Sequence, residues 1–313
     1  MKIVFMGTPD YAARALEAVI AAGHEVTAVV TQPDKPKGRS GQMQFSPVKE
    51  CAVKYHLPVL QPVKIRDPES VSALKAYEAD IYVVAAFGQI LTKELLEFPK
   101  LGSINLHASL LPKYRGASPI QWCIINGEKE TGVTIMQMDE GIDTGDILTT
   151  TVVPIVEKET AETLFDKLSE AGAQLLVNTL PKLAAGEIVP KPQDNSLSTP
   201  TKIIKKSLGK IDWTKDAVAI ERLVRGLNSW PSAYTFYQGK SVKLWNCDVV
   251  TSDRSNERPA GTIIRIAKDS IDVSCGKGIL RILELQLEGK KRMDTKSFLL
   301  GNQWKEGSCF GEA

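Results

Sequence analysis

The sequence predicts an α/β domain built on a mostly parallel sheet, followed by a small C-terminal β-barrel domain. In the first half, short β-branched runs alternate with amphipathic runs, as in parallel sheets whose strands are connected by helices. A polar, proline-containing stretch follows Gly186, and five short apolar runs separated by turn residues come after it. A chain of 313 residues is also long for one hydrophobic core, which favours two domains.

Continuous apolar runs in the first half predict strands that are covered on both faces, and runs with helical spacing predict the helices between them. The expected strands are Lys2–Met6, Glu25–Thr31, Asp80–Ala86, Ser103–Ala108, Gly132–Met138 and Ile147–Val153. The expected helices are Tyr11–Ala22, Pro68–Tyr77 and Glu159–Ala185. Because strands and helices alternate, we expect right-handed crossovers between parallel strands.

The second half is expected to begin after an interdomain linker. The stretch EIVPKPQDNSLSTPT has three prolines and many polar residues, which is typical of a linker. We therefore predict a catalytic domain at 1–189, a linker at 190–206 and a second domain at 207–313. In the second domain we expect one helix, Ala217–Leu227, and the strands Tyr234–Tyr237, Val242–Val250, Gly261–Ala267, Ser270–Ser274 and Gly278–Leu285. An oligonucleotide-binding-type (OB-fold-like) barrel is one candidate for these strands.

Composition favours a cytoplasmic protein. Apolar content of 43% and charged content of 24% are ordinary for a globular chain, and no run of about 18 apolar residues suggests a membrane span. The N-terminal run MKIVFMGTPD enters a strand at once, so we expect no signal or transit peptide. Five scattered cysteines without a C-x-x-C pair suggest reduced thiols rather than disulfides or a zinc site. Without heptads, a monomer is expected.

The charge is distributed unevenly along the chain. Residues 201–313 contain 20 Lys and Arg against 13 Asp and Glu, a net charge of +7, although the whole chain carries only +2. A basic C-terminal region suggests a polyanionic partner. The alternative is an ordinary solvated surface, because charge differences of this size are common.

Two glycine- and proline-containing segments follow the first two strands. Gly7-Thr8-Pro9-Asp10 precedes a helix and is a candidate anion-binding turn, or a plain turn in which Asp10 caps the helix. It lacks the G-x-G-x-x-G pattern, which disfavours a dinucleotide. The segment Asp34–Val48 is too rich in Gly, Pro and Lys to predict a helix or strand. Its cations, Lys35, Lys37 and Arg39, are candidate phosphate contacts, unless the segment is only a solvated insertion.

The strongest candidate site combines an amide, an imidazole and a carboxylate. Asn105 and His107 are two residues apart on a predicted strand, so their side chains share one face, about 6 to 7 Å apart. His107 lies at the strand's C-terminal end, where open α/β sheets bind ligands. Asp143, between Gly141 and Gly145, is expected to close onto them. The alternative is a hydrogen-bonded core histidine beside a structural asparagine.

These groups favour direct acyl transfer. The amide and an imidazolium can donate to a developing oxyanion, and the aspartate can set the protonation state of the imidazole or move a proton. The acidic loop Asp139–Asp146 lacks the spacing of a calcium-binding EF-hand, so we expect no metal. Transfer from a bound donor to an incoming amine fits this set of groups, and hydrolysis by water fits it almost as well.

Several motifs of the chain resemble those of one enzyme family. Asn105-x-His107, Ser109-Leu110-Leu111-Pro112 and the Asp139–Asp146 loop resemble the signature of folate-dependent formyltransferases. The opening GTPDYAA, the run GVTIMQM at 132–138 and the C-terminal IDW, NSWP and GKK motifs resemble the methionyl-tRNA formyltransferases within that family. The resemblance spans essentially the whole chain.

The resemblance implies a Rossmann-like domain that binds 10-formyltetrahydrofolate and a C-terminal barrel that helps to hold methionyl initiator tRNA. It implies that Asn105, His107 and Asp143 are catalytic, and that Arg39 probes the tRNA. It implies folate contacts by the residues Phe87, Gly88, Gln89, Ile90, Leu91, Ser109, Leu110, Leu111 and Pro112. Relatives carry more basic residues where this chain has Ser40-Gly41-Gln42, which bears on the strength of its phosphate contacts.

Three other functions stay open at this stage. A formyltransferase for a nucleotide-sugar amine shares the same three residues but has no need of the basic segment 34–48 or of the basic C-terminal region. An RNA-binding module that only senses folate has no need of the three polar residues. Hydrolysis of the formyl donor would release formate without an acceptor.

Overall fold

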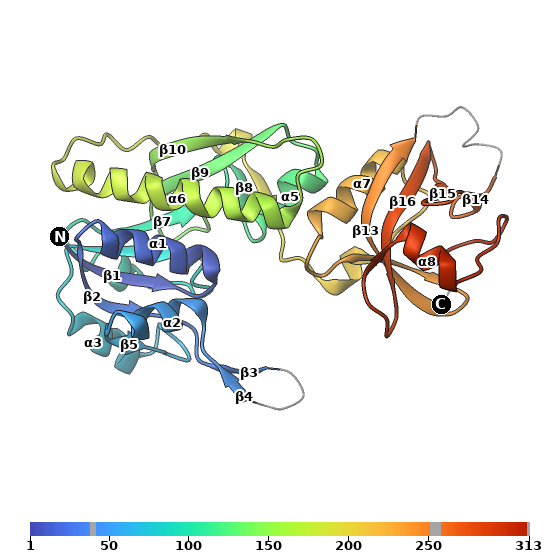
Figure 1. Ribbon diagram of the computed structural model, residues 1–313. Coiled ribbons are helices and arrows are strands. Elements are labelled where there is room, and N and C mark those ends of the chain that lie inside the picture. Colours follow the sequence, from blue (N-terminus) through green and yellow to red (C-terminus); the bar gives the residue numbers. More distant parts are fainter. Residues whose placement is uncertain (38–41, 251–257, 312–313) are drawn as a thin grey trace. The chain divides into compact units, whose positions relative to one another are not determined.

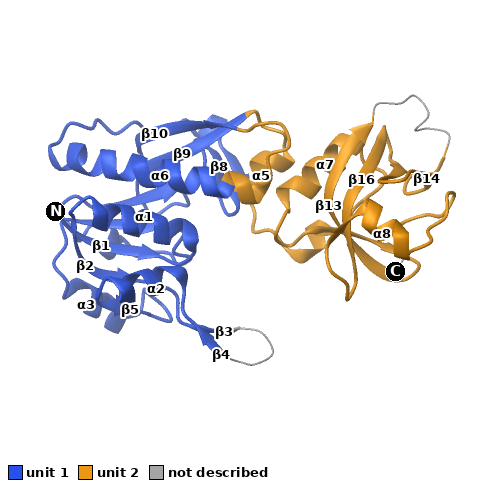
Figure 2. Ribbon diagram, viewed as in Figure 1, with its two compact units in different colours: residues 1–119, 130–154, 165–201 blue, residues 120–129, 155–164, 202–313 orange. Residues whose placement is uncertain are grey.

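The computed structural model describes residues 1–37, 42–250 and 258–311 (Figure 1). The chain divides into two compact units (Figure 2). Unit 1 consists of Met1–Pro119, Glu130–Pro154 and Phe165–Thr201, and unit 2 consists of Ile120–Lys129, Ile155–Leu164 and Lys202–Ala313. The two units are therefore interleaved in sequence, because two short segments of the first half belong to unit 2.

Unit 1 is built on a seven-stranded sheet with the order β10-β9-β7-β6-β1-β2-β5. Its strands are β1 (Lys2–Gly7), β2 (Glu25–Val30), β5 (Val59–Leu60), β6 (Ile81–Ala85), β7 (Ser103–His107), β9 (Glu130–Gln137) and β10 (Ile147–Pro154). The strands from β7 to β5 in this order pair in parallel. At the other side of the sheet, β9 pairs antiparallel with β7, and β10 pairs antiparallel with β9. The predicted mostly parallel sheet is confirmed.

Helices connect these strands and cover the sheet (Figure 1). They are α1 (Asp10–Ala21), α2 (Pro47–Lys54), α3 (Pro68–Lys75), α4 (Lys93–Leu96) and most of α6 (Ala161–Ala184). The helix α5 (Pro119–Ile125) belongs to unit 2 from Ile120 onward. Local residues determine where α2 begins. The hydroxyl of the N-cap residue Ser46 accepts from the backbone N–H of Lys49, and proline occupies the first turn of the helix. Apolar side chains from β1, β2 and β6 pack with α3 and α4, and the largest of them are Met6, Leu74, Tyr82, Phe87 and Leu95.

Two short strands lie where the sequence predicted no regular element. β3 (Lys35–Lys37) and β4 (Gln42–Gln44) pair antiparallel, with Lys35 opposite Gln44. The prediction that 34–48 is too rich in Gly, Pro and Lys to form an element was therefore wrong. A two-stranded ribbon needs only backbone hydrogen bonds, and Pro36 is tolerated because no third strand needs its missing N–H. We call β3 and β4 the arm.

Unit 2 is built on an antiparallel sheet with the order β12-β13-β16-β15-β14, and β17 pairs with β16. Its strands are β12 (Ala233–Tyr237), β13 (Lys240–Val250), β14 (Ile263–Ile266), β15 (Ile271–Ser274), β16 (Ile279–Leu287) and β17 (Met293–Asp294), and its helices include α7 (Ala217–Gly226) and α8 (Thr295–Gly301). The five predicted strands and the helix at 217 are confirmed. No helix among the described residues is both long and apolar enough to cross a membrane.

The C-terminal residues bond to both edge strands of this sheet. Beside β14, the backbone N–H of Ile263 donates to the carbonyl of Ser308. Beside β12, the N–H of Gly311 donates to the carbonyl of Phe236. The tail thus covers two edges that would otherwise offer unpaired backbone groups. Aromatic rings pack together in the core of unit 2, where Trp213, Tyr237, Phe298 and Phe310 are buried and Trp304 is partly buried.

The segment predicted to be a linker is bonded to unit 1 over much of its length. Lys191 exchanges backbone hydrogen bonds with Ile147 at the start of β10. Farther along, β11 (Thr199–Thr201) pairs in parallel with β8 (Lys113–Gly116). We call residues 190–201 the strap. The predicted domain limits at 189 and 207 stay a prediction, because they concern which parts fold independently.

Candidate active site

The three candidate catalytic residues come together at one edge of the unit 1 sheet. Asn105 and His107 lie on β7, near its C-terminal end. Asp143 lies in the loop between β9 and β10. Because β6 and β7 are parallel neighbours, the segments that follow them, 87–91 and 109–112, leave the sheet at the same edge. The strand alternation that placed Asn105 and His107 on one face is confirmed by their shared contact with Asp143.

The carboxylate of Asp143 lies between the amide and the imidazole. Asn105 Nδ2 donates to Asp143 Oδ1 at 3.3 Å. Asp143 Oδ2 lies 3.5 Å from His107 Nδ1. All three side chains are largely shielded from solvent, with His107 6% exposed as a residue. A charged pair in such a place interacts more strongly than one in water.

The short strand β8 holds two of these residues. His107 Nε2 lies 2.9 Å from the carbonyl oxygen of Tyr114. A carbonyl oxygen only accepts, so Nε2 carries the hydrogen of this bond. Two residues farther on, the backbone N–H of Gly116 donates to Asp143 Oδ2 at 2.8 Å. β8 therefore fixes the imidazole ring from one side and the carboxylate from the other.

The loop that contains Asp143 is tightly built. Asp143 has a positive φ of 54°, which Asp tolerates better than most residues with a Cβ. Asp139 Oδ1 accepts from the backbone N–H of Gly141 at 3.0 Å and from Thr144 Oγ1 at 2.7 Å. A Cβ on Gly145 would lie 1.8 Å from the carbonyl oxygen of Gln137, so only glycine fits there. A Cβ on Gly141 would lie 1.9 Å from Thr144 Oγ1 and would disturb its bond to Asp139. Both glycines near Asp143 are therefore explained by the close packing of this loop.

The predicted folate-contacting turn after β7 is held by Thr134 of β9. Thr134 Oγ1 donates to the carbonyl of Ser109 at 2.7 Å and accepts from the N–H of Leu111 at 3.1 Å. Ser109 and Leu111 are buried, whereas Leu110 and Pro112 are partly exposed. The turn is thus rigid before any ligand arrives, although two of the backbone groups predicted to line a pocket already have protein partners.

The second predicted folate segment, 87–91, presents a mixed surface. Ile90 is 75% exposed, whereas Phe87 and Leu91 are buried. The Phe87 carbonyl accepts from the side chains of Thr8 and Gln32, at 3.2 and 3.1 Å. Gln89 bonds back to the chain, because its Oε1 accepts from Ile65 N–H at 2.6 Å and its Nε2 donates to the Pro62 carbonyl at 3.0 Å. Ile90 and the exposed backbone at Gly88 remain the candidate contacts with a ligand.

The arm is anchored at its base by a polar network. The Lys49 ammonium pairs with the Asp34 carboxylate, and Gln61 donates to that carboxylate at 2.8 Å. These hydrogen bonds, chiefly the one from Lys49, hold the pKa of Asp34 below its usual value. Lys35 is exposed on β3. Lys37 ends β3, and the predicted contact Arg39 lies outside the described residues.

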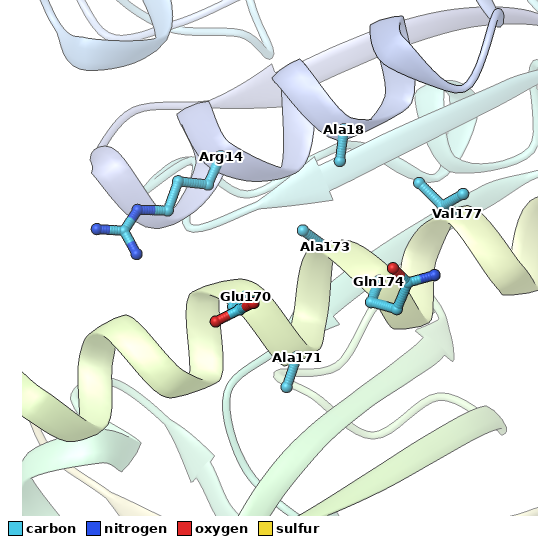
Figure 3. Close-up of a pocket in the computed structure, with 7 residues that line it drawn as sticks. All are labelled: Arg14, Ala18, Glu170, Ala171, Ala173, Gln174 and Val177. Carbon is cyan, nitrogen blue, oxygen red and sulfur yellow. The ribbon is translucent and has the colours of Figure 1, made fainter.

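A surface hollow of about 460 Å³ lies elsewhere on unit 1, between α1 and α6 (Figure 3). It is lined by Arg14, Ala18, Glu170, Ala171, Ala173, Gln174 and Val177. None of the predicted site residues lines it.

Sequence reasoning missed the residues that hold the site together. Tyr114 and Gly116 act through their backbone atoms, which carry no signal in the residue type. Arg115, only 8% exposed, and Gln193 form a further link to the Asp143 loop. A charged residue three positions after Pro112, in a predicted ligand-binding loop, was a usable signal for Arg115. Gln193 carried no such signal, because its surroundings have the composition of a linker.

Comparison with known proteins identifies the family. A family profile described as "Formyl transferase" matches residues 1–180, and one described as "Formyl transferase, C-terminal domain" matches residues 203–303. A curated relative from Agathobacter rectalis named methionyl-tRNA formyltransferase is 54% identical over 310 residues, covering 99% of each chain. A relative of the same name from Geobacter sulfurreducens is 48% identical over 313 residues, covering 100% of this chain and 98% of its own.

Solved structures share the fold at lower identity. An N-formyltransferase from Helicobacter canadensis, solved with folinic acid and dTDP-3-aminofucose, is 21% identical with a TM-score of 0.67, covering 94% of this chain and 100% of its own. HypX from Aquifex aeolicus, solved with tetrahydrofolic acid, is 17% identical with a TM-score of 0.63, covering 100% of this chain and 51% of its own. These likenesses concern the fold alone, whereas the curated relatives match almost end to end at about half identity. The chain therefore belongs to the formyl transferase family of enzymes, in the group whose members are named methionyl-tRNA formyltransferase.

Proposed function

We propose that this enzyme transfers the formyl group of 10-formyltetrahydrofolate to the free α-amino group of methionyl initiator tRNA. The observation that carries the proposal is the contact of Asp143 with both Asn105 and His107 at the carboxyl edge of the sheet. The names of the curated relatives supply the substrate class. The reaction gives N-formylmethionyl-tRNA for translation initiation, which is why we place the enzyme in the cytoplasm. The absence of heptads in the sequence is the reason for proposing a monomer.

We assign a distinct task to each polar residue. As the methionine amino group attacks the formyl carbon, negative charge develops on the formyl oxygen. The Asn105 amide and His107 Nδ1–H donate to that oxygen, because Nε2 is already bonded to the Tyr114 carbonyl. Asp143 stabilises the imidazolium and helps to move the ammonium proton to N10 of the folate, whose bond to the formyl carbon then breaks. No covalent enzyme intermediate is required.

The donor is proposed to bind where the segments after β6 and β7 leave the sheet. The family uses folate-derived formyl donors, and the residues here suit a pterin ring. Ile90 offers an exposed apolar side chain between the core residues Phe87 and Leu91 of the same segment, and the Thr134 bonds hold the turn at Ser109–Pro112. A turn that is ordered in advance lowers the entropic cost of binding.

The tRNA is proposed to contact the arm and the basic C-terminal region. Lys35, Lys37 and Arg39 are the proposed phosphate contacts on the arm, and residues 201–313 add their net charge of +7. The base of the arm is fixed by the pairing of Asp34, the residue before Lys35, with Lys49. A small sugar acceptor would not need these features.

The test is transfer of labelled formyl from 10-formyltetrahydrofolate to three acceptors: methionyl initiator tRNA, methionyl elongator tRNA and a nucleotide-sugar amine. We expect label on initiator tRNA alone. Label on the sugar amine would replace the proposal with sugar formylation. Formate release at the same rate with and without an acceptor would indicate a hydrolase, and equal labelling of both tRNAs would remove the initiator specificity.

A further inference from the structure

Gln193, in the strap, bridges the Asp143 loop and a buried arginine. Its Nε2 donates to the carbonyl oxygens of Asp143 and Gly145, at 2.9 and 2.7 Å. Its Oε1 accepts from Arg115 Nε and Nη2, at 3.0 and 2.8 Å. One amide thus uses both of its ends, with two bonds on each, and all four bonds stay inside the protein.

The two carbonyls that Gln193 holds flank the part of the loop that carries the reactive carboxylate. Asp143 has a left-handed backbone, a conformation that persists where its surroundings fix it from several directions. Asp139 bonds to Gly141 and Thr144 and so fixes the loop from within. Gln193 fixes it from outside, at the residue whose side chain faces His107 and at the glycine two positions later.

Arg115 gives this contact a firm base. Arg115 is largely buried, and its planar guanidinium presents several donors in a fixed geometry. One of them, Nη2, also donates to Asn195 Oδ1 at 2.9 Å. Arg115 belongs to the same short strand whose neighbouring residues, Tyr114 and Gly116, bond to His107 and to the Asp143 carboxylate. Three successive residues of β8 therefore reach the imidazole, the Gln193 amide and the carboxylate.

We propose that Gln193 is a positioning residue for formyl transfer: it holds the backbone at Asp143 so that the carboxylate faces Asn105 and His107. This inference rests on the proposed function, since the placement of Asp143 affects the rate only if Asp143 takes part in the reaction. Gln193 acts through Asp143 and is not itself catalytic. Its loss should therefore lower kcat and leave the KM values for folate and tRNA nearly unchanged. A displacement of about 1 Å in a reacting group can cost about 100-fold, so we expect kcat to fall by about 10- to 100-fold.

Two variants of Gln193 separate positioning from support of the fold. Q193A removes all four bonds. Q193E keeps an oxygen that accepts from Arg115 but replaces the donor toward the carbonyls of Asp143 and Gly145 with a second acceptor. Positioning predicts that both variants lose kcat. If Gln193 only ties the strap to Arg115, Q193E would keep normal kcat, and that result would overturn the proposal.

The matched control is N195A, in the same strap. It removes the amide oxygen of Asn195, which accepts from Arg115 Nη2, and leaves the bonds from Gln193 to the Asp143 loop intact. We expect its kcat to stay within about twofold of wild type, by the same reasoning on positioning. The melting temperature of each variant identifies any loss of fold. If Q193A has a lowered melting temperature, the kcat of Q193E, which retains the Arg115 contact, decides the question. If N195A lost kcat as strongly as Q193E, the effect would belong to Arg115 and not to the Asp143 carbonyl.

A double-mutant cycle with D143N separates this inference from the proposed function. If Gln193 acts through Asp143, adding Q193A to D143N should change kcat by less than about twofold, because the group being positioned is already disabled. Near-normal turnover by D143N would contradict the catalytic role proposed for Asp143 within that function, whether or not Gln193 positions it. Loss of turnover in D143N with normal kcat in Q193A and Q193E would leave that function intact and overturn only the positioning role.

Discussion

His107 Nδ1 faces Asp143 Oδ2 at 3.5 Å, while the other ring nitrogen of His107 donates to the backbone carbonyl of Tyr114. A neutral ring with its hydrogen on Nε2 would direct a lone pair at the carboxylate. The imidazolium form instead presents a donor to each partner. The separation is also longer than a good hydrogen bond, so Nδ1–H can turn part of its interaction toward an oxygen that approaches between the two groups. Nδ1 is therefore the ring nitrogen that we propose to act on the formyl oxygen.

Asn105 supplies the neutral donor beside that imidazole, and N105A is expected to lower kcat by about 100-fold or more, as the loss of an oxyanion donor does. The measurement is single-turnover formyl transfer with saturating folate and tRNA. The control is N178A, which removes an asparagine of α6 whose Oδ1 accepts from Gln174 Nε2 at 3.1 Å. A folded N105A protein with near-normal turnover would exclude an oxyanion role for the amide.

Much of the fold could be predicted because local patterns determine it. The strands β1, β2, β6 and β7 are continuous apolar runs, and the sheet places them as covered parallel strands. The two-residue spacing of Asn105 and His107 fixed their shared face, and the end of β7 fixed their edge of the sheet. Asp143 could be included because its flanking glycines signalled a tight loop, although its pairing with both residues had to come from the structure.

The remainder depends on backbone groups and on contacts between distant segments. The arm strands pair through main-chain bonds that polar side chains do not reveal. Tyr114 holds His107 with a carbonyl that every residue type possesses. Gln193 lies 50 positions beyond Asp143, in a stretch whose composition indicates a linker, so nothing local connects it to the site.

The arm lysines should act through charge. Each lysine that contacts a phosphate adds about 1 to the slope of log affinity against log salt, so K35A/K37A should lower the slope for initiator tRNA by about 2. The KM for the folate should not change. The measurement is tRNA affinity by filter binding between low and physiological salt, with K182A on α6 as a charge-matched control. An unchanged slope in K35A/K37A would remove these two lysines from the interface.

The thiols should differ sharply in reactivity. Cys51, Cys123, Cys247 and Cys275 are buried, whereas Cys309 is exposed. Burial raises the pKa of the Cys51 thiol to about 11 and that of Cys275 to about 12, so their reactive thiolate forms stay scarce up to about pH 9. We expect a thiol reagent at pH 8 to label one cysteine per native chain, and C309S to remove that label. Rapid labelling of several cysteines in folded C309S would contradict the buried arrangement.

Unit 2 contains a buried ion pair whose loss should destabilise it. Glu221, 6% exposed, accepts from Arg225 Nε at 2.7 Å, and Arg225 also donates to the Glu159 carbonyl at 2.7 Å. Lys158 lies 3.4 Å from the same carboxylate. E221A leaves a shielded guanidinium without its anion, and breaking such a pair costs about 3 kcal/mol in the free energy of unfolding.

The control for E221A is E284A, which breaks the pair between Glu284 and Arg292. Those side chains are 26% and 45% exposed, and solvent-exposed pairs contribute about 1 kcal/mol or less. All five tryptophans lie in the segments of unit 2, so urea unfolding followed by tryptophan fluorescence reports on this unit. We expect the midpoint of E221A to fall well below that of E284A. Equal urea midpoints would mean that water replaces the lost carboxylate partner of Arg225 as readily as that of Arg292. The burial of Glu221 would then not make its ion pair the more stabilising one.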